Sequence, residues 1–197
     1  MFLGPCISIL IGSLFLKFRD REWLFEKLNL KGDERVLDVG CGHGLLLIGA
    51  AKRLHLGGKS FGLDLWSQDD QASNNKEATL HNAKLEGVLD RVEIVDGDMR
   101  QMPFPENHFD AIVSSWAIHN IYNAEGRAEA LKEIIRVLKP GGKFAILDID
   151  HGSEYFQFFR SQENSLEAST IQKLGPHFTF GNFTHLIIGQ KRPAAAV

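Results

Sequence analysis

Residues 36–44 read VLDVGCGHG, and this stretch decides what kind of fold the sequence can form. The apolar run at 35–39 is typical of a short buried strand, and residues 43–54 predict a helix packed close to it. Glycine at 40, 42 and 44 permits positive φ and close backbone approach, because no Cβ intervenes. Considered in isolation, such a loop predicts only a tight strand-to-helix turn.

The rest of the chain alternates between short strands and longer helices. Further strands are expected at 60–65, 91–95, 109–114, 143–148, 168–174 and 183–190, and further helices at 75–87, 125–138 and 155–164. This alternation predicts an α/β fold with a doubly wound, mostly parallel, seven-stranded sheet. No helix separates the last two strands, so we expect them to pair as an antiparallel hairpin at one edge of the sheet.

Three aspartates, Asp38, Asp64 and Asp98, stand at the ends of three successive predicted strands. Ligands of a doubly wound sheet bind outside the carboxyl ends of its strands, and an acid about 20 residues after the glycine loop suits ribose hydroxyls. Three carboxylates fit a nucleoside with a cationic end better than one with a pyrophosphate. Leu45 also stands where the dinucleotide pattern G-x-G-x-x-G requires glycine, which argues against a dehydrogenase.

Four motifs resemble, in order, those of the class I S-adenosylmethionine-dependent methyltransferases. They are VLDVGCGHG (36–44), GLDLW (62–66), DGDMRQMPFPENHFDAIVSSWAIHNI (96–121) and KEIIRVLKPGG (132–142), and the resemblance covers residues 33–150. The motifs are most similar to the branch that methylates small molecules such as quinones, sterols and arsenite. The resemblance implies a Rossmann-like fold with S-adenosylmethionine as the cofactor.

The same resemblance implies cofactor-binding roles for ten residues. The glycine loop and Asp38 would meet the methionine portion, and Asp64 would bind the ribose hydroxyls with Leu65 beside the adenine. Asp98 would accept from the adenine amino group, Met99 would pack on its ring, and a serine after the fourth strand would lie near the methyl end. The full set is Asp38, Gly40, Gly42, Gly44, Asp64, Leu65, Asp98, Met99, Ser114 and Ser115.

Methyl transfer from a sulfonium is an in-line displacement, in which the protein mainly aligns the acceptor and excludes water. A base is needed only if the acceptor must lose a proton. His119 and His151 are the candidates for a base or an acceptor-orienting group, because imidazole titrates near neutral pH. The alternatives are that His119 hydrogen-bonds a loop and that His151 caps a helix. We expect Trp116 in the core or facing the cofactor rather than stacking on a substrate.

Composition and charge limit the class of protein. A length of 197 residues suits one domain, and 44% hydrophobic residues exclude intrinsic disorder. A net charge of −3 argues against a nucleic-acid partner. Cys6 and Cys41 are too few for a disulfide framework or a zinc site, so no metal is expected. The sequence leaves the oligomeric state open.

The first 16 residues carry no charged side chain, and Lys17, Arg19 and Arg21 follow at once. The run is just short of the ~17 residues that a membrane span needs. We treat residues 1–30 as an apolar N-terminal segment and 31–197 as the S-adenosylmethionine-binding domain. The segment is a membrane anchor or its remnant, a helix packed on the domain, or a lid. As an anchor, its basic flank would hold the catalytic domain on the cytoplasmic side; otherwise we expect a cytoplasmic protein.

The sequence as a whole predicts a methyltransferase that uses S-adenosylmethionine on a small acceptor, with lipophilic compounds among the candidates. The expected partners are this small molecule and, through residues 1–21, a membrane surface. The alternative is a non-catalytic module that binds S-adenosylmethionine or a related nucleoside and regulates a partner. Both hypotheses need the same binding residues, so only turnover separates them.

Overall fold

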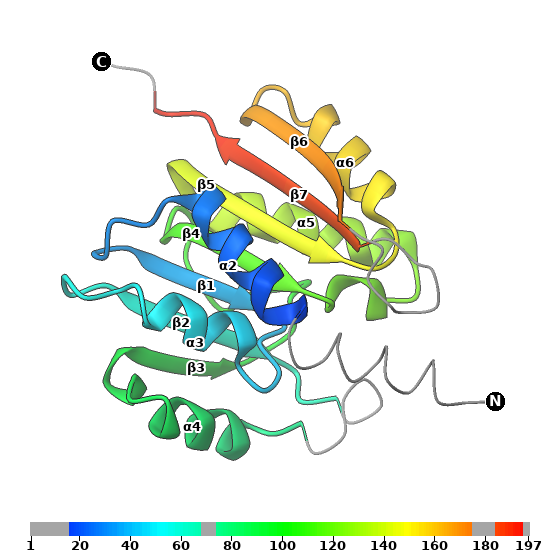
Figure 1. Ribbon diagram of the computed structural model, residues 1–197. Helices are drawn as coiled ribbons and strands as arrows, with labels where there is room; N and C mark the ends of the chain where they lie inside the picture. Colours follow the sequence, from blue (N-terminus) through cyan, green and yellow to red (C-terminus); the bar gives the residue numbers. More distant parts are fainter. Residues whose placement is uncertain (1–15, 68–73, 175–183, 195–197) are drawn as a thin grey trace.

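The computed structural model describes residues 16–67, 74–174 and 184–194, which include seven strands joined in one sheet (Figure 1). The strands are β1 (Arg35–Val39), β2 (Lys59–Asp64), β3 (Val92–Asp96), β4 (Phe109–Ser115), β5 (Leu138–Asp148), β6 (Leu166–Leu174) and β7 (Thr184–Lys191). Their order across the sheet is β3-β2-β1-β4-β5-β7-β6, and β1 to β5 are parallel. The predicted doubly wound, mostly parallel sheet is therefore confirmed.

The expected antiparallel hairpin is formed by β6 and β7, which pair from Leu166 opposite Lys191 to Leu174 opposite Thr184. Strand β7, not β6, also pairs with β5, and that pairing is antiparallel. The outermost strand β6 consequently runs parallel to β1–β5, and β7 is the one reversed strand. The connecting turn, expected at 175–182, lies outside the described residues.

Helices cover both faces of the sheet (Figure 1). They are α2 (Lys17–Leu28), α3 (Leu45–Ala51), α4 (Lys76–Leu85), α5 (Ala124–Val137) and α6 (Gly152–Ser161), with short 3-10 turns η2 (Leu89–Arg91) and η3 (Ile118–Asn120). Side chains of a strand alternate between its two faces. Val36 of β1 accordingly joins the core under α2 and α3, while Leu37 joins the core under α5 and α6.

The junction between α5 and β5 differs from the prediction. Helix α5 ends at Val137, but β5 begins at Leu138 instead of at residue 143, where the strand was expected to begin. Leu138 pairs with Phe109, while Ala111, two residues further along β4, pairs with Lys143. Residues 139–142 therefore form an irregular bulge within an extended segment, which a local reading of proline and glycine as turn signals does not predict.

Helix α2 fixes where the N-terminal segment joins the fold. Leu24, Phe25 and Leu28 are almost fully buried against the sheet, so this part of the segment shares the domain's core. The carbonyl of Leu28 accepts a hydrogen bond from Lys143 Nζ at 3.4 Å, near the amino end of the regular part of β5. Helix α2 therefore starts toward the carboxyl ends of the strands, as Figure 1 shows.

Residues 1–15 lie outside the described part of the chain, so the proposed boundary between residues 30 and 31 stays a prediction. Within residues 16–67, 74–174 and 184–194, no helix is long and apolar enough to cross a membrane.

Candidate cofactor and acceptor site

The glycine loop after β1 adopts a conformation that other residues tolerate poorly. Gly40, Gly42 and Gly44 have φ of 72°, 46° and 91°. The backbone N–H groups of Gly40 and Cys41 both donate to the carbonyl of Leu63, at 2.8 and 3.2 Å, which binds the loop to the end of β2. A Cβ on Gly40 would lie 2.3 Å from the Cβ of Ala117, so glycine is required where the loop meets the segment after β4.

Asp38 lies just before this loop with its carboxyl group buried. Its Oδ2 accepts a hydrogen bond from the Leu47 N–H at 2.8 Å, and its Oδ1 is buried without a hydrogen-bond partner among the described residues. Burial raises the pKa of Asp38 to about 8, and the negative charge of Asp64 acts in the same direction. An unsatisfied buried carboxyl oxygen is costly and is suited to a cationic ligand group.

Asp64 ends β2 and organises the neighbouring loops. Its Oδ2 accepts from the Gly42 N–H at 2.8 Å, and its Oδ1 accepts from the Trp66 N–H at 2.7 Å and from Asn74 Nδ2 at 3.2 Å. Leu65, the next residue, is 59% exposed. A carboxylate beside an exposed apolar side chain presents the two surfaces that a ribose and an adenine ring need.

Asp98 is held by a neighbour that the sequence interpretation missed. Arg100 places Nε 2.9 Å and Nη2 2.5 Å from Asp98 Oδ2. This hydrogen bonding holds the pKa of Asp98 below its ordinary value. Strand β3 ends at Asp96, two residues earlier than Asp98, and Asp96 accepts from Trp66 Nε1 at 2.9 Å. The assignment of Asp98 to the adenine amino group stays a prediction.

The remaining cofactor candidates lie at the ends of β3 and β4. Met99 is partly buried, and its Cε would lie 3.4 Å from a Cβ on Gly40, so it faces the glycine loop. Ser114 is buried, and its hydroxyl donates to the carbonyl of Val39 at 2.8 Å, which fastens β4 to β1. Ser115 ends β4 and is partly exposed. Of the two serines, Ser115 is therefore better placed to meet a ligand.

His119 is positioned by the buried carboxylate of Asp148 at the end of β5. The His119 N–H donates to Asp148 Oδ2 at 3.1 Å, and its ring Nδ1 lies 2.5 Å from Asp148 Oδ1. The Tyr155 hydroxyl lies 3.4 Å from Asp148 Oδ2, and burial raises the pKa of this tyrosine. A carboxylate held this way orients an imidazole and stabilises its protonated form.

His151 occupies a different setting, at the N-cap position of α6 with φ of 55°. Its Nδ1 lies 3.5 Å from Glu154 Oε2 and its Nε2 lies 3.7 Å from Asp150 Oδ2. The structure therefore does not give the two histidines the same partner, and His151 interacts with acids at the start of its own helix.

Two further residues shape this edge of the sheet. Arg127, which sequence patterns did not single out, is buried on α5 and donates to both carboxylate oxygens of Glu154, at 2.9 and 2.7 Å. It also donates to the carbonyls of Ile121 and Tyr122, which holds the segment after β4 in place. Trp116 is 41% exposed, so of its two expected positions the one in the core is wrong, while the one facing the cofactor stays a prediction.

No metal site accompanies these groups: within the described ranges, no three His, Cys, Asp or Glu side chains are arranged to bind an ion. The glycine loop, its strand-end carboxylates and the strand order define a class I, Rossmann-like methyltransferase fold. Residues 37–146 match the family model of the methyltransferase domain, and the chain belongs to this family.

Among its relatives, the chain is 34% identical to the sterol 4-C-methyltransferase strm-1 of Caenorhabditis elegans over 130 residues, which are 66% of this chain and 35% of that protein. It is 33% identical to a demethylmenaquinone methyltransferase of Lactobacillus johnsonii over 130 residues, which are 65% and 49% of the two chains. The chain thus spans about a third to a half of the length of these relatives.

Solved structures share the fold. A SAM-dependent methyltransferase from Aquifex aeolicus superposes with a TM-score of 0.70 at 19% identity, covering 94% of this chain and 97% of that one. The [4+2]-cyclase SpnF gives 0.73 at 17% identity, covering 90% and 82%. Since one of these neighbours is named for a cyclisation, the fold alone does not decide the reaction.

Proposed function

We propose that this protein transfers a methyl group from S-adenosylmethionine to a small, lipophilic acceptor. The observation that carries the proposal is the buried Oδ1 of Asp38, which has no hydrogen-bond partner among the described residues and lies just before a loop of three glycines with positive φ. The cofactor's amino-acid end carries an ammonium group, which would supply the partner that this oxygen lacks. When bound, the cofactor supplies an electrophilic methyl group on a sulfonium.

Each predicted binding residue has a role consistent with its surroundings. Gly40 lets the loop that would meet the methionine portion pack directly against Ala117, and Asp64 offers its carboxylate to the ribose hydroxyls. Leu65 and Met99 provide apolar surface for the adenine, with Asp98 at its amino group. This chain's residues thus bind and orient the donor, and the acceptor must approach from the ends of β4 and β5.

The lipophilic character of the acceptor is supported by the names of the relatives, which act on sterols and on demethylmenaquinone. His119 is our candidate to take or orient an acceptor proton, because Asp148 would stabilise its protonated form. His151 is the second candidate, and its position among the acids of α6 supports it less. The substitutions His119→Gln and His151→Gln distinguish these two candidates. We expect His119→Gln to lower turnover far more than His151→Gln, and we expect both variants to keep the cofactor affinity of the wild type.

The experiment that tests the function is transfer of radiolabelled methyl from S-adenosylmethionine into a cell extract, separated into lipid and aqueous fractions. We expect label in the lipid fraction with the wild-type protein, much less at the same cofactor concentration with Asp64→Ala, and normal labelling with the surface control Leu85→Ala. Label in the aqueous fraction would contradict a lipophilic acceptor. Binding of the cofactor without label in either fraction would favour the non-catalytic alternative.

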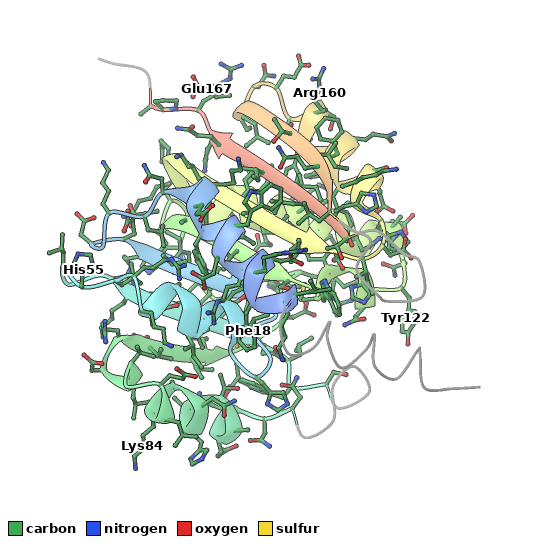
Figure 2. All side chains as sticks on the ribbon, viewed as in Figure 1. Phe18, His55, Lys84, Tyr122, Arg160 and Glu167 are labelled. Carbon is green, nitrogen blue, oxygen red and sulfur yellow. The ribbon has the colours of Figure 1, made fainter. Side chains whose placement is uncertain are left out.

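We also propose that residues 1–21 bring the carboxyl ends of the strands, toward which α2 starts, to the cytoplasmic face of a membrane. The uncharged run joins the fold at the start of α2, where Lys17, Phe18 and Arg19 are exposed. Figure 2 shows Phe18 at this end of the helix. Basic residues beside an aromatic one suit a leaflet with anionic lipids.

Vesicle flotation tests the membrane proposal, with and without phosphatidylserine in phosphatidylcholine. We expect the full chain to float with anionic vesicles, and Lys17→Gln combined with Arg19→Gln to reduce flotation. Lys84→Gln, a charge change on α4, is the matched control and should leave flotation unchanged. Equal flotation of all three proteins would contradict the proposed basic contact.

A further inference from the structure

Trp116 is exposed, although most residues around it in the chain are buried. It is the first residue beyond β4 and is 41% exposed, while Ser114, Ala117 and Ile118 are at most 9% exposed. A large apolar side chain in water at the border of a binding site is informative, because such surface is normally covered. Trp116 therefore needs an explanation beyond the packing of the domain.

The backbone of Trp116 adopts an unfavourable conformation. Its φ is 53°, in the left-handed region that bulky residues seldom occupy. The conformation is fixed on both sides: the Trp116 N–H donates to the carbonyl of Leu147 at 2.8 Å, and the Cβ of Ala117 blocks the space beside Gly40. Strain of this kind persists where the surrounding structure imposes it and is concentrated at functional sites.

The position of Trp116 relates it to the acceptor side of the site. It directly precedes Ala117, which contacts the glycine loop, and it lies three residues before His119, which Asp148 positions. Trp116 is therefore one residue from the contact with the glycine loop and three residues from the candidate acceptor-orienting histidine. Tyr122, on the same connection, is 99% exposed and points outward (Figure 2).

We propose that Trp116 is an acceptor-binding residue whose indole stacks on a flat, conjugated ring of the substrate. This inference rests on the proposed methyltransferase function and deepens it, because it names planar ring compounds as the preferred acceptor class. Aromatic rings attract one another in offset or edge-to-face arrangements and lose little conformational freedom on contact. A stacked ring is held in one plane, which restricts the direction in which its reacting atom meets the methyl group.

The chain offers a direct optical test, because it contains three tryptophans, at 23, 66 and 116. Three proteins each keep one tryptophan and replace the other two with phenylalanine. Fluorescence of the Trp116-only protein reports ligand binding at the proposed acceptor-binding residue. Fluorescence of the Trp66-only protein reports binding on the ribose side, where Trp66 contacts Asp64 and Asp96. The Trp23-only protein reports α2 and serves as the control. The probe is 1,4-naphthoquinone, a flat ring that quenches indole fluorescence.

We expect naphthoquinone to quench the Trp116-only protein in a saturable manner and the Trp23-only protein only weakly and linearly. A saturated bicyclic ketone of similar size, 2-decalone, should not compete with it. Equal quenching of both proteins, or competition by decalone at equal concentration, would overturn the proposal. S-adenosylmethionine should change the emission of the Trp66-only protein. If the protein binds the cofactor but naphthoquinone does not quench Trp116 fluorescence, the acceptor-binding role of Trp116 is refuted, while the proposed function is not.

Substitutions at Trp116 separate an acceptor role from a cofactor-facing role. Trp116→Leu keeps an apolar side chain without a ring and should lower the affinity for naphthoquinone about three- to tenfold. Trp116→Phe keeps a ring and should retain most of this affinity. Leu85→Ala, at an exposed leucine of α4, is the control. Both Trp116 variants should bind S-adenosylmethionine like the wild type in calorimetry. Loss of cofactor affinity matching the loss of naphthoquinone affinity would instead make Trp116 a wall of the cofactor site.

Discussion

The buried carboxyl of Asp38 makes the stability of this protein depend on pH in a direction that the structure determines. The side chain is 2% exposed, and its single described hydrogen bond comes from Leu47 at 2.8 Å. Burial raises its pKa to about 8, compared with 3.8 for an ordinary aspartate. Near neutral pH, Asp38 therefore keeps its proton in the folded chain and loses it in the unfolded chain.

Because the folded state binds this proton more tightly, the stabilisation is complete below about pH 4 and is lost as the pH rises through about 8. Where the folded group is protonated and the unfolded group is ionised, the free energy of unfolding falls by about 1.4 kcal/mol per pH unit. Between about pH 5.5 and about pH 7.5, Asp38 alone accounts for a loss of ~2.5 kcal/mol.

Asp38→Asn isolates this contribution, because it removes the titrating group and keeps a carbonyl oxygen for the Leu47 N–H. Urea unfolding of both proteins across this pH range measures it. The free energy of unfolding of the wild type should fall relative to the variant by ~2.5 kcal/mol as the pH rises. Parallel pH profiles for the two proteins would show that Asp38 does not titrate between these states and would refute the reasoning.

Three further substitutions test other parts of the site. Gly40→Ala should lower the free energy of unfolding in urea by at least ~2 kcal/mol more than Gly57→Ala does. The φ angle is positive at both positions, but only the new Cβ at Gly40 would clash, 2.3 Å from the Cβ of Ala117. Equal losses of stability would contradict the clash. Asp64→Ala should make the binding free energy of S-adenosylmethionine about 1.5–3 kcal/mol less favourable in calorimetry. An unchanged affinity would show that the ribose lies elsewhere. Ser114→Ala should cost about 1 kcal/mol of stability and leave cofactor affinity unchanged, because its hydroxyl donates within the sheet.

The fold was predictable because its signals are local and repeated. The apolar run before Gly40 predicts β1, and β1, β2 and β4 lie within a residue or so of their expected bounds. Such runs form buried strands of a parallel sheet wherever helices separate them. The bulged start of β5 was not predictable, because Leu138 joins the sheet through pairing with Phe109, a contact that distant residues determine.

The positions of candidate site residues were predictable where a residue type and a strand end coincide, as at Asp38 and Asp64, whose roles toward a cofactor stay predictions. It was not predictable where a neighbour decides the role of a side chain. Asp98 is held by Arg100, two residues away, and Ser114 is turned into the sheet toward Val39. The chemistry of Trp116 favoured a position in the core or one facing the cofactor, and only the structure shows that its side chain is exposed.

The central claim is that the carboxyl edge of this sheet binds S-adenosylmethionine with the ammonium group at Asp38. Calorimetric titration near pH 7, in phosphate and in Tris buffer, tests it most directly. We expect saturable 1:1 binding with a dissociation constant below about 1 mM and with proton release, because a cation lowers the pKa of a carboxyl group. Absence of binding at millimolar cofactor, or binding without proton exchange, would contradict it.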